Sequence, residues 1–198
     1  MGLRILKLKT PLSDNDVRAL KVGDVVYLTG IIVTARDLAH KKAVELLKSG
    51  GSLPLSLRGL AVFHAGPIVR KEDGKWRIIA IGPTTSTRME DVEYDFIRLT
   101  GVKMVIGKGG MGEKTRRALK EYCCVYAVYP GGAAAIAPTM IEEVVDVYWL
   151  ELGIPEALWV LKVRDFGPLI TVMGSHGNNL YGDVMRRARE VYESLTRD

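Results

Sequence analysis

Cysteine and long apolar runs are both scarce in this sequence, and each absence excludes a class of protein. The only two cysteines, Cys123 and Cys124, are adjacent in a predicted buried strand, where successive side chains point to opposite faces. They cannot build a disulfide framework or a metal site, and no metal-ligating residue is predicted in this chain. The apolar stretches are strand-sized and interrupted by charge, which excludes a membrane span.

The N-terminal residues also lack the apolar block of a signal peptide, because Arg4, Lys7 and Lys9 are spaced through them. A strong excess of one charge is missing too, since 28 lysines and arginines against 23 acids give a net charge of +5. A nucleic-acid-binding surface would need more basic residues with interleaved aromatics. We therefore expect a soluble cytoplasmic protein without a membrane or nucleic-acid partner.

The sequence contains enough apolar residues for one sizeable core. It has 198 residues, of which 47% are hydrophobic, and no repeat divides it, so residues 1–198 are predicted to form a single domain. Strands are predicted at 3–8, 25–33, 60–69, 76–81, 102–106, 123–129, 157–163 and 169–173, and helices from Asp37 to Gly50, at 139–148 and at 181–197. Hairpin signals such as Asp73-Gly74 alternate with strand–loop–helix patterns, and this mixture predicts a mixed α/β fold.

Two strand–loop–helix units in the middle of the chain organise this fold. In the first, the strand at 76–81 leads into Gly82-Pro83-Thr84-Thr85-Ser86-Thr87-Arg88 and then into a helix that ends at Gly101. In the second, the strand at 102–106 leads into a glycine loop at 107–112 and a short helix. Both loops are expected at one edge of a sheet, where helix N-termini, hydroxyl groups and basic side chains suit a carboxylate or phosphate.

The glycine loop leaves a nucleotide-binding protein open as an alternative. Residues 107–115 nearly spell the phosphate loop of P-loop NTPases, in which a lysine directly follows the last glycine. Here Glu113 intervenes and turns Lys114 by about 100° around the helix, away from the phosphates. No apolar strand ending in aspartate is present to hold magnesium, so this alternative ranks below the others, together with a small-anion-binding module.

Five residues lie where a predicted strand gives way to a loop or helix: Arg36, Thr84, Thr85, Arg88 and Lys108. An arginine beside a helix is usually solvated, and a threonine pair is usually a helix cap. None of the five residues is therefore strong evidence for a binding site by itself. Together they predict a site for a small dianion. His40 and His64 occupy promising positions, but a lone histidine is more often a hydrogen-bonded structural residue, and His176 is expected to serve its turn.

Four segments of the chain resemble, in order, the β subunit of class I fumarases and L-tartrate dehydratases. They are Gly30-Ile31-Ile32-Val33-Thr34-Ala35-Arg36-Asp37-Leu38-Ala39-His40, His64-Ala65-Gly66-Pro67, Gly82-Pro83-Thr84-Thr85-Ser86-Thr87-Arg88-Met89 and Lys108-Gly109-Gly110-Met111. The resemblance covers nearly the whole chain. It implies a swivelling β/β/α fold, which forms the C-terminal domain of single-chain enzymes and a separate chain in two-subunit enzymes.

This resemblance also implies a function. The family adds water across the double bond of a dicarboxylate, with a [4Fe-4S] cluster whose open iron acts as a Lewis acid. The cysteine ligands of that cluster are missing here, so a cluster-bearing α subunit is the implied partner, in a hetero-oligomer with two copies of each subunit. The isolated chain is expected to be inactive.

By similarity, Arg36, Arg88 and Lys108 grip the substrate carboxylates, Thr85 helps to orient the substrate, and Thr84 is the proposed base. A threonine hydroxyl is a poor base, and the sequence shows no neighbour that activates Thr84. The leading interpretation is a fumarate hydratase β subunit, with L-tartrate dehydratase as its alternative.

Overall fold

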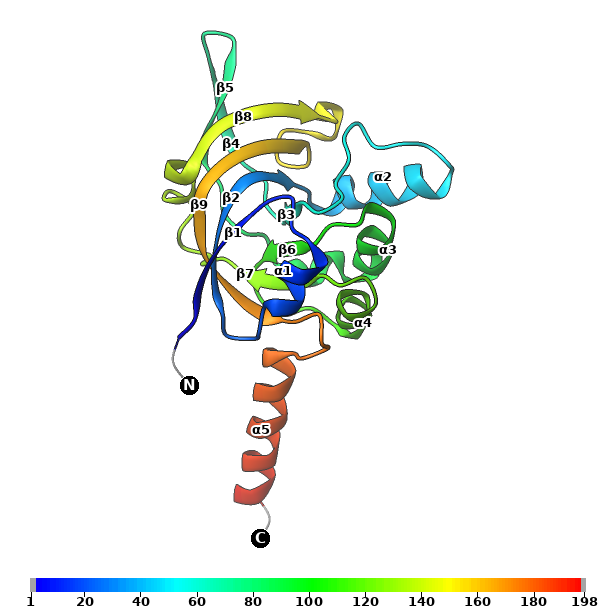
Figure 1. The fold of residues 1–198 in the computed structure, drawn as a ribbon, viewed down its shortest axis with the longest axis vertical. Helices are drawn as coiled ribbons and strands as arrows, with labels where there is room; N and C mark the ends of the chain where they lie inside the picture. Colours follow the sequence, from blue (N-terminus) through cyan, green and yellow to red (C-terminus); the bar gives the residue numbers. More distant parts are fainter. Residues whose placement is uncertain (1–2, 197–198) are drawn as a thin grey trace.

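The computed structural model describes residues 3–196, and its centre is a seven-stranded mixed sheet (Figure 1). The strands are β1 (Ile5–Lys9), β2 (Val25–Thr34), β3 (Ala61–Phe63), β6 (Met104–Gly107), β7 (Val125–Val128), β8 (Ile141–Tyr148) and β9 (Leu158–Met173), with β4 (Ile68–Glu72) and β5 (Lys75–Ala80) in a separate hairpin. The helices are α1 (Asp14–Ala19), α2 (Asp37–Lys48), α3 (Glu90–Thr100), α4 (Glu113–Glu121) and α5 (Leu180–Leu195). The mixed α/β class predicted from the sequence is confirmed.

Five of these strands close into a ring. Strands β2, β3, β6 and β7 are parallel neighbours, and β9 runs antiparallel to β7 and also to β2. Strand β1 extends the sheet beside β2, and β8 extends it beside β9. The carboxyl ends of β2, β3 and β6 therefore lie together at one end of the ring.

The ring strands β3, β6 and β7 bury side chains on both faces, and none of their residues is charged. In β3, Ala61 and Phe63 join a core that includes α1 and the hairpin, whereas Val62 joins a second core beneath α2, α3 and α4. Those three helices cover one side of the ring (Figure 1). Continuous apolar runs are typical of parallel strands that are buried in this way.

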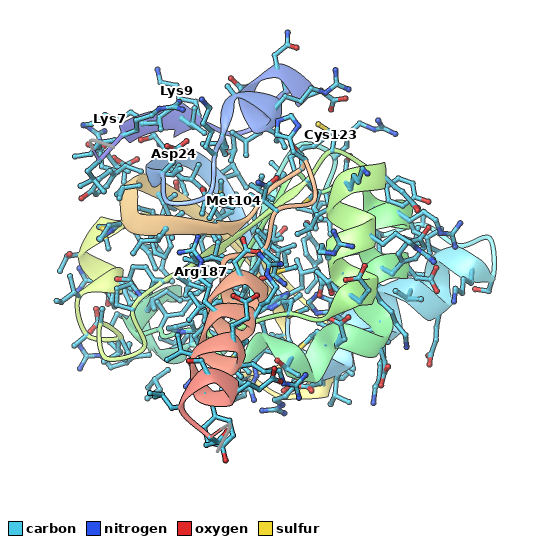
Figure 2. All side chains as sticks on the ribbon, turned by 90° about the horizontal axis from the view of Figure 1, so that it is seen from below. Lys7, Lys9, Asp24, Met104, Cys123 and Arg187 are labelled. Atoms are coloured by element: carbon cyan, nitrogen blue, oxygen red, sulfur yellow. The ribbon has the colours of Figure 1, made fainter. Side chains whose placement is uncertain are left out.

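Strand β1 lies at the sheet edge and alternates as predicted. Leu6 and Leu8 pack against the core, while Lys7 and Lys9 are exposed on the other face of the strand (Figure 2). Near it, Gly30 marks a bulge and a close approach of two backbone segments. Its φ is +119°, the β2–β9 register shifts beside it, and a Cβ there would lie 2.5 Å from Thr10 Oγ1.

The helix predicted at 139–148 is wrong. A 3-10 turn, η2 (Ala137–Met140), leads into strand β8, which pairs with β9. Two register shifts along β8 bring Ile141, Val144 and Val147 onto the core at a spacing of three residues. The bulges therefore gave this strand an apolar period close to that of a helix.

Other boundaries also differ from the prediction. The strands expected at 157–163 and 169–173 are one 16-residue strand, β9, because the backbone stays paired through the intervening segment. The strand expected at 60–69 is split between β3 and the hairpin, and β7 begins only after the cysteines, since Cys123 has a φ of 52°. The Asp73-Gly74 hairpin is confirmed, but its strand β5 lies outside the main sheet.

The C-terminal helix α5 projects away from the ring (Figure 1). It was predicted at 181–197, of which the last residue lies outside the described part of the chain. None of its described residues is buried. Within residues 3–196, no helix combines the length and the apolar character that crossing a membrane requires.

Candidate functional site

The candidate site lies where three neighbouring parallel strands end. Arg36 follows β2, His64 follows β3 and Lys108 follows β6. Loops at the carboxyl ends of parallel strands are the usual place for ligand sites in sheets of this kind. The loop after β5 crosses the same end, because the Thr84 N–H donates to the His64 carbonyl at 2.6 Å and Thr85 forms a parallel bridge with Lys108. The predicted meeting of the two loops is confirmed.

The four hydroxyl groups of the first loop divide into two pairs. Ser86 is buried, with its Oγ 3.0 Å from Nδ1 of His64, and Thr87 donates to the Gly110 carbonyl at 2.7 Å. Within the described part of the chain, the hydroxyls of Thr84 and Thr85 have no hydrogen-bond partner. Ser86 and Thr87 therefore hold the loop, and Thr84 and Thr85 are the two that a ligand can engage.

The two arginines are already paired with acids. Arg88 Nε donates to Oδ1 of Asp37 at 3.2 Å, and Nη2 lies 2.7 Å from Oδ2 of the same carboxylate in an ion pair. Arg36 Nε lies 3.3 Å from Glu156 Oε1, and the other oxygen of Glu156 accepts the backbone N–H of Leu38 at the start of α2. These two acids, which the sequence analysis did not identify, fix the arginines before any ligand binds.

Lys108 differs from both arginines because, among residues 3–196, no carboxylate pairs with its exposed side chain. The aliphatic part of its side chain lies beside Gly131, so that a Cβ on this glycine would be 3.6 Å from Cδ of Lys108. Gly131 belongs to a loop of small residues at 130–135, where the Ile81 N–H donates to the Ala134 carbonyl at 3.0 Å. Lys108 is therefore the cation of the site that is freest to meet an anionic ligand.

The N-terminus of α4 argues against the phosphate loop. Glu90 occupies it: its carboxylate accepts the backbone N–H of Gly112 at 2.7 Å and both the N–H and the hydroxyl of Thr115. Lys114 points elsewhere and pairs with Asp91 at 2.9 Å. A phosphate at this helix end would have to displace a bound carboxylate, so the helix dipole is already neutralised from within the chain.

Beneath the site lies a fully buried group of three titratable side chains. The Nε2 atoms of His40 and His64 each lie 3.3 Å from Oε2 of Glu93, and all three side chains are 0% exposed. Burial disfavours ionisation of Glu93, but the two histidines outweigh it and lower the pKa of its carboxyl group to about 2. Burial lowers the pKa of His64, which favours its neutral form. The structure thus joins two histidines that the sequence analysis treated separately.

Glu93 itself was missed, although the sequence carries a signal for it. It is four residues after Met89 and three before Phe96, and both of those side chains are buried. An acid in the middle of the apolar face of an amphipathic helix is unusual, because burying an unpaired carboxylate is costly. Such a position indicates a buried partner, and the candidates were the histidines that precede it in the chain.

The remaining candidates lie away from this site. His176 was expected to serve its turn, but its side chain contacts α1, with its Nε2 3.1 Å from the Arg18 carbonyl oxygen. Cys123 (labelled in Figure 2) and Cys124 are both buried and free. Burial raises the pKa of the Cys124 thiol, which disfavours the thiolate that metal binding requires.

Comparison with known proteins identifies relatives over nearly the whole chain. The family model described as fumarase C-terminus matches residues 2–184. The L(+)-tartrate dehydratase subunit beta of Escherichia coli strain K12 is 48% identical over 176 residues, which are 89% of this chain and 86% of that protein. A Methanocaldococcus jannaschii protein, provisionally named L(+)-tartrate dehydratase subunit beta, is 49% identical over 185 residues, or 93% of each chain.

A longer relative is covered only in part. The Geobacillus stearothermophilus protein provisionally named fumarate hydratase class I is 44% identical over 188 residues, which are 94% of this chain but 35% of that protein. All four segments quoted from the sequence lie within the residues that the family model matches.

Proposed function

This chain belongs to the fumarase C-terminus family, and from that premise we propose that it is the β subunit of a two-subunit hydro-lyase for a small dicarboxylate. The observation that carries the proposal is the convergence of Arg36, Thr84, Thr85 and Lys108 at one end of the ring, where three parallel strands terminate. These are residues to which the resemblance gives substrate contacts. Their setting suits a small anion, because the cations are few and fixed.

Within this proposal, the residues of the chain have distinct tasks. Lys108, which has no acidic partner among residues 3–196, attracts one carboxylate of the substrate. Arg36 and Arg88 offer the N–H groups that their acids leave free, and Glu156 and Asp37 keep the guanidinium planes oriented. Fixing the substrate's angle in this way matters for a stereospecific elimination.

Thr84 and Thr85 present their hydroxyls beside these cations. Thr84 is the proposed base, and no acid or histidine among the described residues accepts a hydrogen bond from its hydroxyl. Its activation would therefore come from the substrate or from the partner subunit. Thr85 takes part in orientation, since its backbone bridge to Lys108 ties the two loops together.

The iron–sulfur cluster of the proposed enzyme does not fit this chain. Two buried cysteines at the end of α4 cannot supply the thiolates of a cubane, and burial raises the pKa of Cys124. We assign the cluster to the α subunit, where it would supply the Lewis acid that labilises the substrate hydroxyl. The complete site would then lie between the two subunits, at the exposed loops around Thr85 and Lys108.

The substrate ranking from the sequence, fumarate before L-tartrate, is reversed in this proposal. The two relatives that match over 86% and 93% of their own length carry the name L(+)-tartrate dehydratase subunit beta, whereas only 35% of the relative with the fumarate hydratase name is matched. L-tartrate is therefore the first candidate substrate, and the fumarate–malate pair is the second.

The test is anaerobic co-expression of this chain with the cluster-bearing α subunit from the same genome, followed by assays with L-tartrate, fumarate and malate. The expected result is a stable complex that dehydrates L-tartrate, while the chain alone turns over none of the three compounds. A complex that acts on fumarate and malate but not on L-tartrate would place fumarate before L-tartrate as the substrate. Failure of the two chains to associate would contradict the proposal as a whole.

A further inference from the structure

Four buried atoms beneath the candidate site have no hydrogen-bond partner: Nε2 of His40, Nε2 of His64, and Oε1 and Oε2 of Glu93. All belong to side chains that are 0% exposed, so bulk water cannot satisfy them. One ligand atom from each of the three residues lies within 4.8 Å of the others. Buried polar atoms are nearly always paired, and four orphaned atoms facing one another need an explanation.

The partners of the other ring nitrogens allow both histidine lone pairs to point at Glu93. Nδ1 of His40 lies 2.9 Å from the carbonyl oxygen of Arg36, which can only accept a hydrogen bond, so Nδ1 carries a proton. In a neutral ring, Nε2 then directs a lone pair at Glu93. Nδ1 of His64 lies 3.0 Å from the Ser86 hydroxyl, which can either accept from it or donate to it. When the hydroxyl accepts, Nε2 of His64 likewise directs its lone pair at Glu93. Such outer hydrogen bonds are typical of histidines that bind a metal.

With both rings neutral, lone pairs of nitrogen and of a carboxylate oxygen would face each other in a site without water. A cation must therefore lie between them, either a proton on a ring or a metal ion. A proton on either Nε2 would form an ion pair with Oε2 at 3.3 Å, but not an aligned N–H···O hydrogen bond. The distance favours a metal: in a tetrahedral zinc site with bonds of about 2.0 to 2.1 Å, neighbouring ligand atoms are about 3.3 to 3.4 Å apart, and both nitrogens lie 3.3 Å from Oε2.

From this geometry we infer that His40, His64 and Glu93 form a zinc site. Each of the three residues offers one ligand atom, and two histidines with one glutamate are a donor set that zinc sites use, with a fourth position left for a water on the ion. Imidazole and carboxylate ligands suit Zn²⁺, and the complete burial of all three side chains favours an ion with a structural role. The prediction of no metal in this chain considered the cysteines and each histidine by itself, and it did not include Glu93.

The zinc site would brace the candidate site from below. His40 lies one helical turn after Arg36, His64 accepts the backbone N–H of Thr84, and Glu93 lies on the helix that follows Arg88. One ion would thus join the end of β3 to the beginnings of α2 and α3. This role is structural and does not depend on the proposed hydratase activity.

The test measures zinc directly. The full chain, expressed without an affinity tag in zinc-supplemented medium and dialysed against EDTA, is analysed by inductively coupled plasma mass spectrometry. We expect about one zinc ion per chain, because a metal enclosed at folding exchanges slowly. Glu93→Gln and His64→Gln should each reduce this to below about a tenth of an ion per chain. His176→Gln is the matched control and should keep its zinc, since this histidine lies outside the cluster.

A measurement on the unsubstituted chain guards against variants that fail to fold. The chain is unfolded with EDTA in denaturant, freed of metal, and refolded with one equivalent of Co²⁺. We expect the intense visible absorption of four-coordinate cobalt. Wild-type protein that holds no zinc as purified and gives only the weak absorption of hydrated cobalt would overturn the inference. So would a folded Glu93→Gln variant that retains zinc at the wild-type level.

Discussion

Helices α3 and α5 are both amphipathic in sequence, yet their side chains have opposite fates. Helix α3 buries Phe96, Ile97 and even the carboxylate of Glu93, because α2, α4 and the ring strands surround it. Helix α5 has 16 residues and buries none, so that Met185 is 69% exposed and Leu195 is 78% exposed. An acid is thus fully buried in one helix, while methionine and leucine lie in solvent in the other.

The difference shows that apolar periodicity predicts a helix but does not identify what covers its apolar face. In α3 the regularly spaced apolar residues contact the core. The one acid among them, Glu93, belongs to the histidine cluster. In α5 the same kind of pattern leaves the helix with almost no share in the stability of the chain. Substitutions in the two regions test whether this difference in burial holds in solution.

The largest effect is expected at Phe96 in α3. Its ring is 0% exposed and lies against His40, with ring centroids 4.1 Å apart. Phe96→Ala should lower the free energy of unfolding by about 3 to 5 kcal/mol, from lost burial and the cavity that remains. Urea unfolding followed by circular dichroism measures the change. A loss below about 1 kcal/mol would mean that α3 does not pack as the structure shows.

The strands of the ring, both loops of the candidate site and the helices that follow them could be predicted from the sequence. The secondary structure of β8 and the extent of β9 could not, because strand pairing changed the local pattern there. The bulges of β8 gave Ile141, Val144 and Val147 a helical spacing, and β9 continues through a segment that contains Gly167 and Pro168. Both the bulges of β8 and the continuation of β9 depend on pairing with strands that are distant in sequence. Apolar periodicity within one segment therefore cannot detect them.

The candidate site was predicted in part. Fixed charges beside glycine and hydroxyl residues could be found locally, and the structure brings Lys108 and Thr85 together. The partners Asp37 and Glu156 could not be assigned, because one of them lies more than a hundred residues from its arginine. The histidine cluster required knowing that α2, β3 and α3 meet, which is a property of the fold and not of any one segment.

In the reconstituted complex, Lys108→Ala should lower kcat/KM by at least about tenfold, the scale of one charge-assisted hydrogen bond of about 1.5 to 3 kcal/mol. Lys114→Ala is the matched control. Its side chain is 62% exposed and pairs with Asp91 on the surface, so its removal should leave the kinetics nearly unchanged. Steady-state assays on both variants check the prediction, and equal losses in the two would remove Lys108 from the site.

The next effect is expected at Gly107, where β6 ends beside Lys108. A Cβ at this position would lie 1.8 Å from the Oγ of Ser86, which is buried against His64. Gly107→Ala should therefore lower the free energy of unfolding by about 1 to 3 kcal/mol through overpacking. Gly132→Ala is its control, because a Cβ there meets nothing within 4 Å. Thermal and urea unfolding of the two variants, measured side by side, should separate them, and indistinguishable curves would contradict the tight packing of the loop on β6.

The smallest effect is expected in α5, and it completes the comparison with Phe96. Met185 is an apolar residue in the middle of an amphipathic helix, as Phe96 is, so a sequence-based estimate would give both substitutions large costs. The structure removes that cost for Met185, since its side chain is mostly in solvent and alanine is at least as good a helix former. Met185→Ala should therefore change the free energy of unfolding of the isolated chain by less than about 0.5 kcal/mol. A loss of 2 kcal/mol or more at micromolar concentration, in the range of buried Met→Ala substitutions, would show that α5 is packed in solution. Repeating the measurement over a hundredfold range of protein concentration separates packing within one chain, which is independent of concentration, from packing between chains.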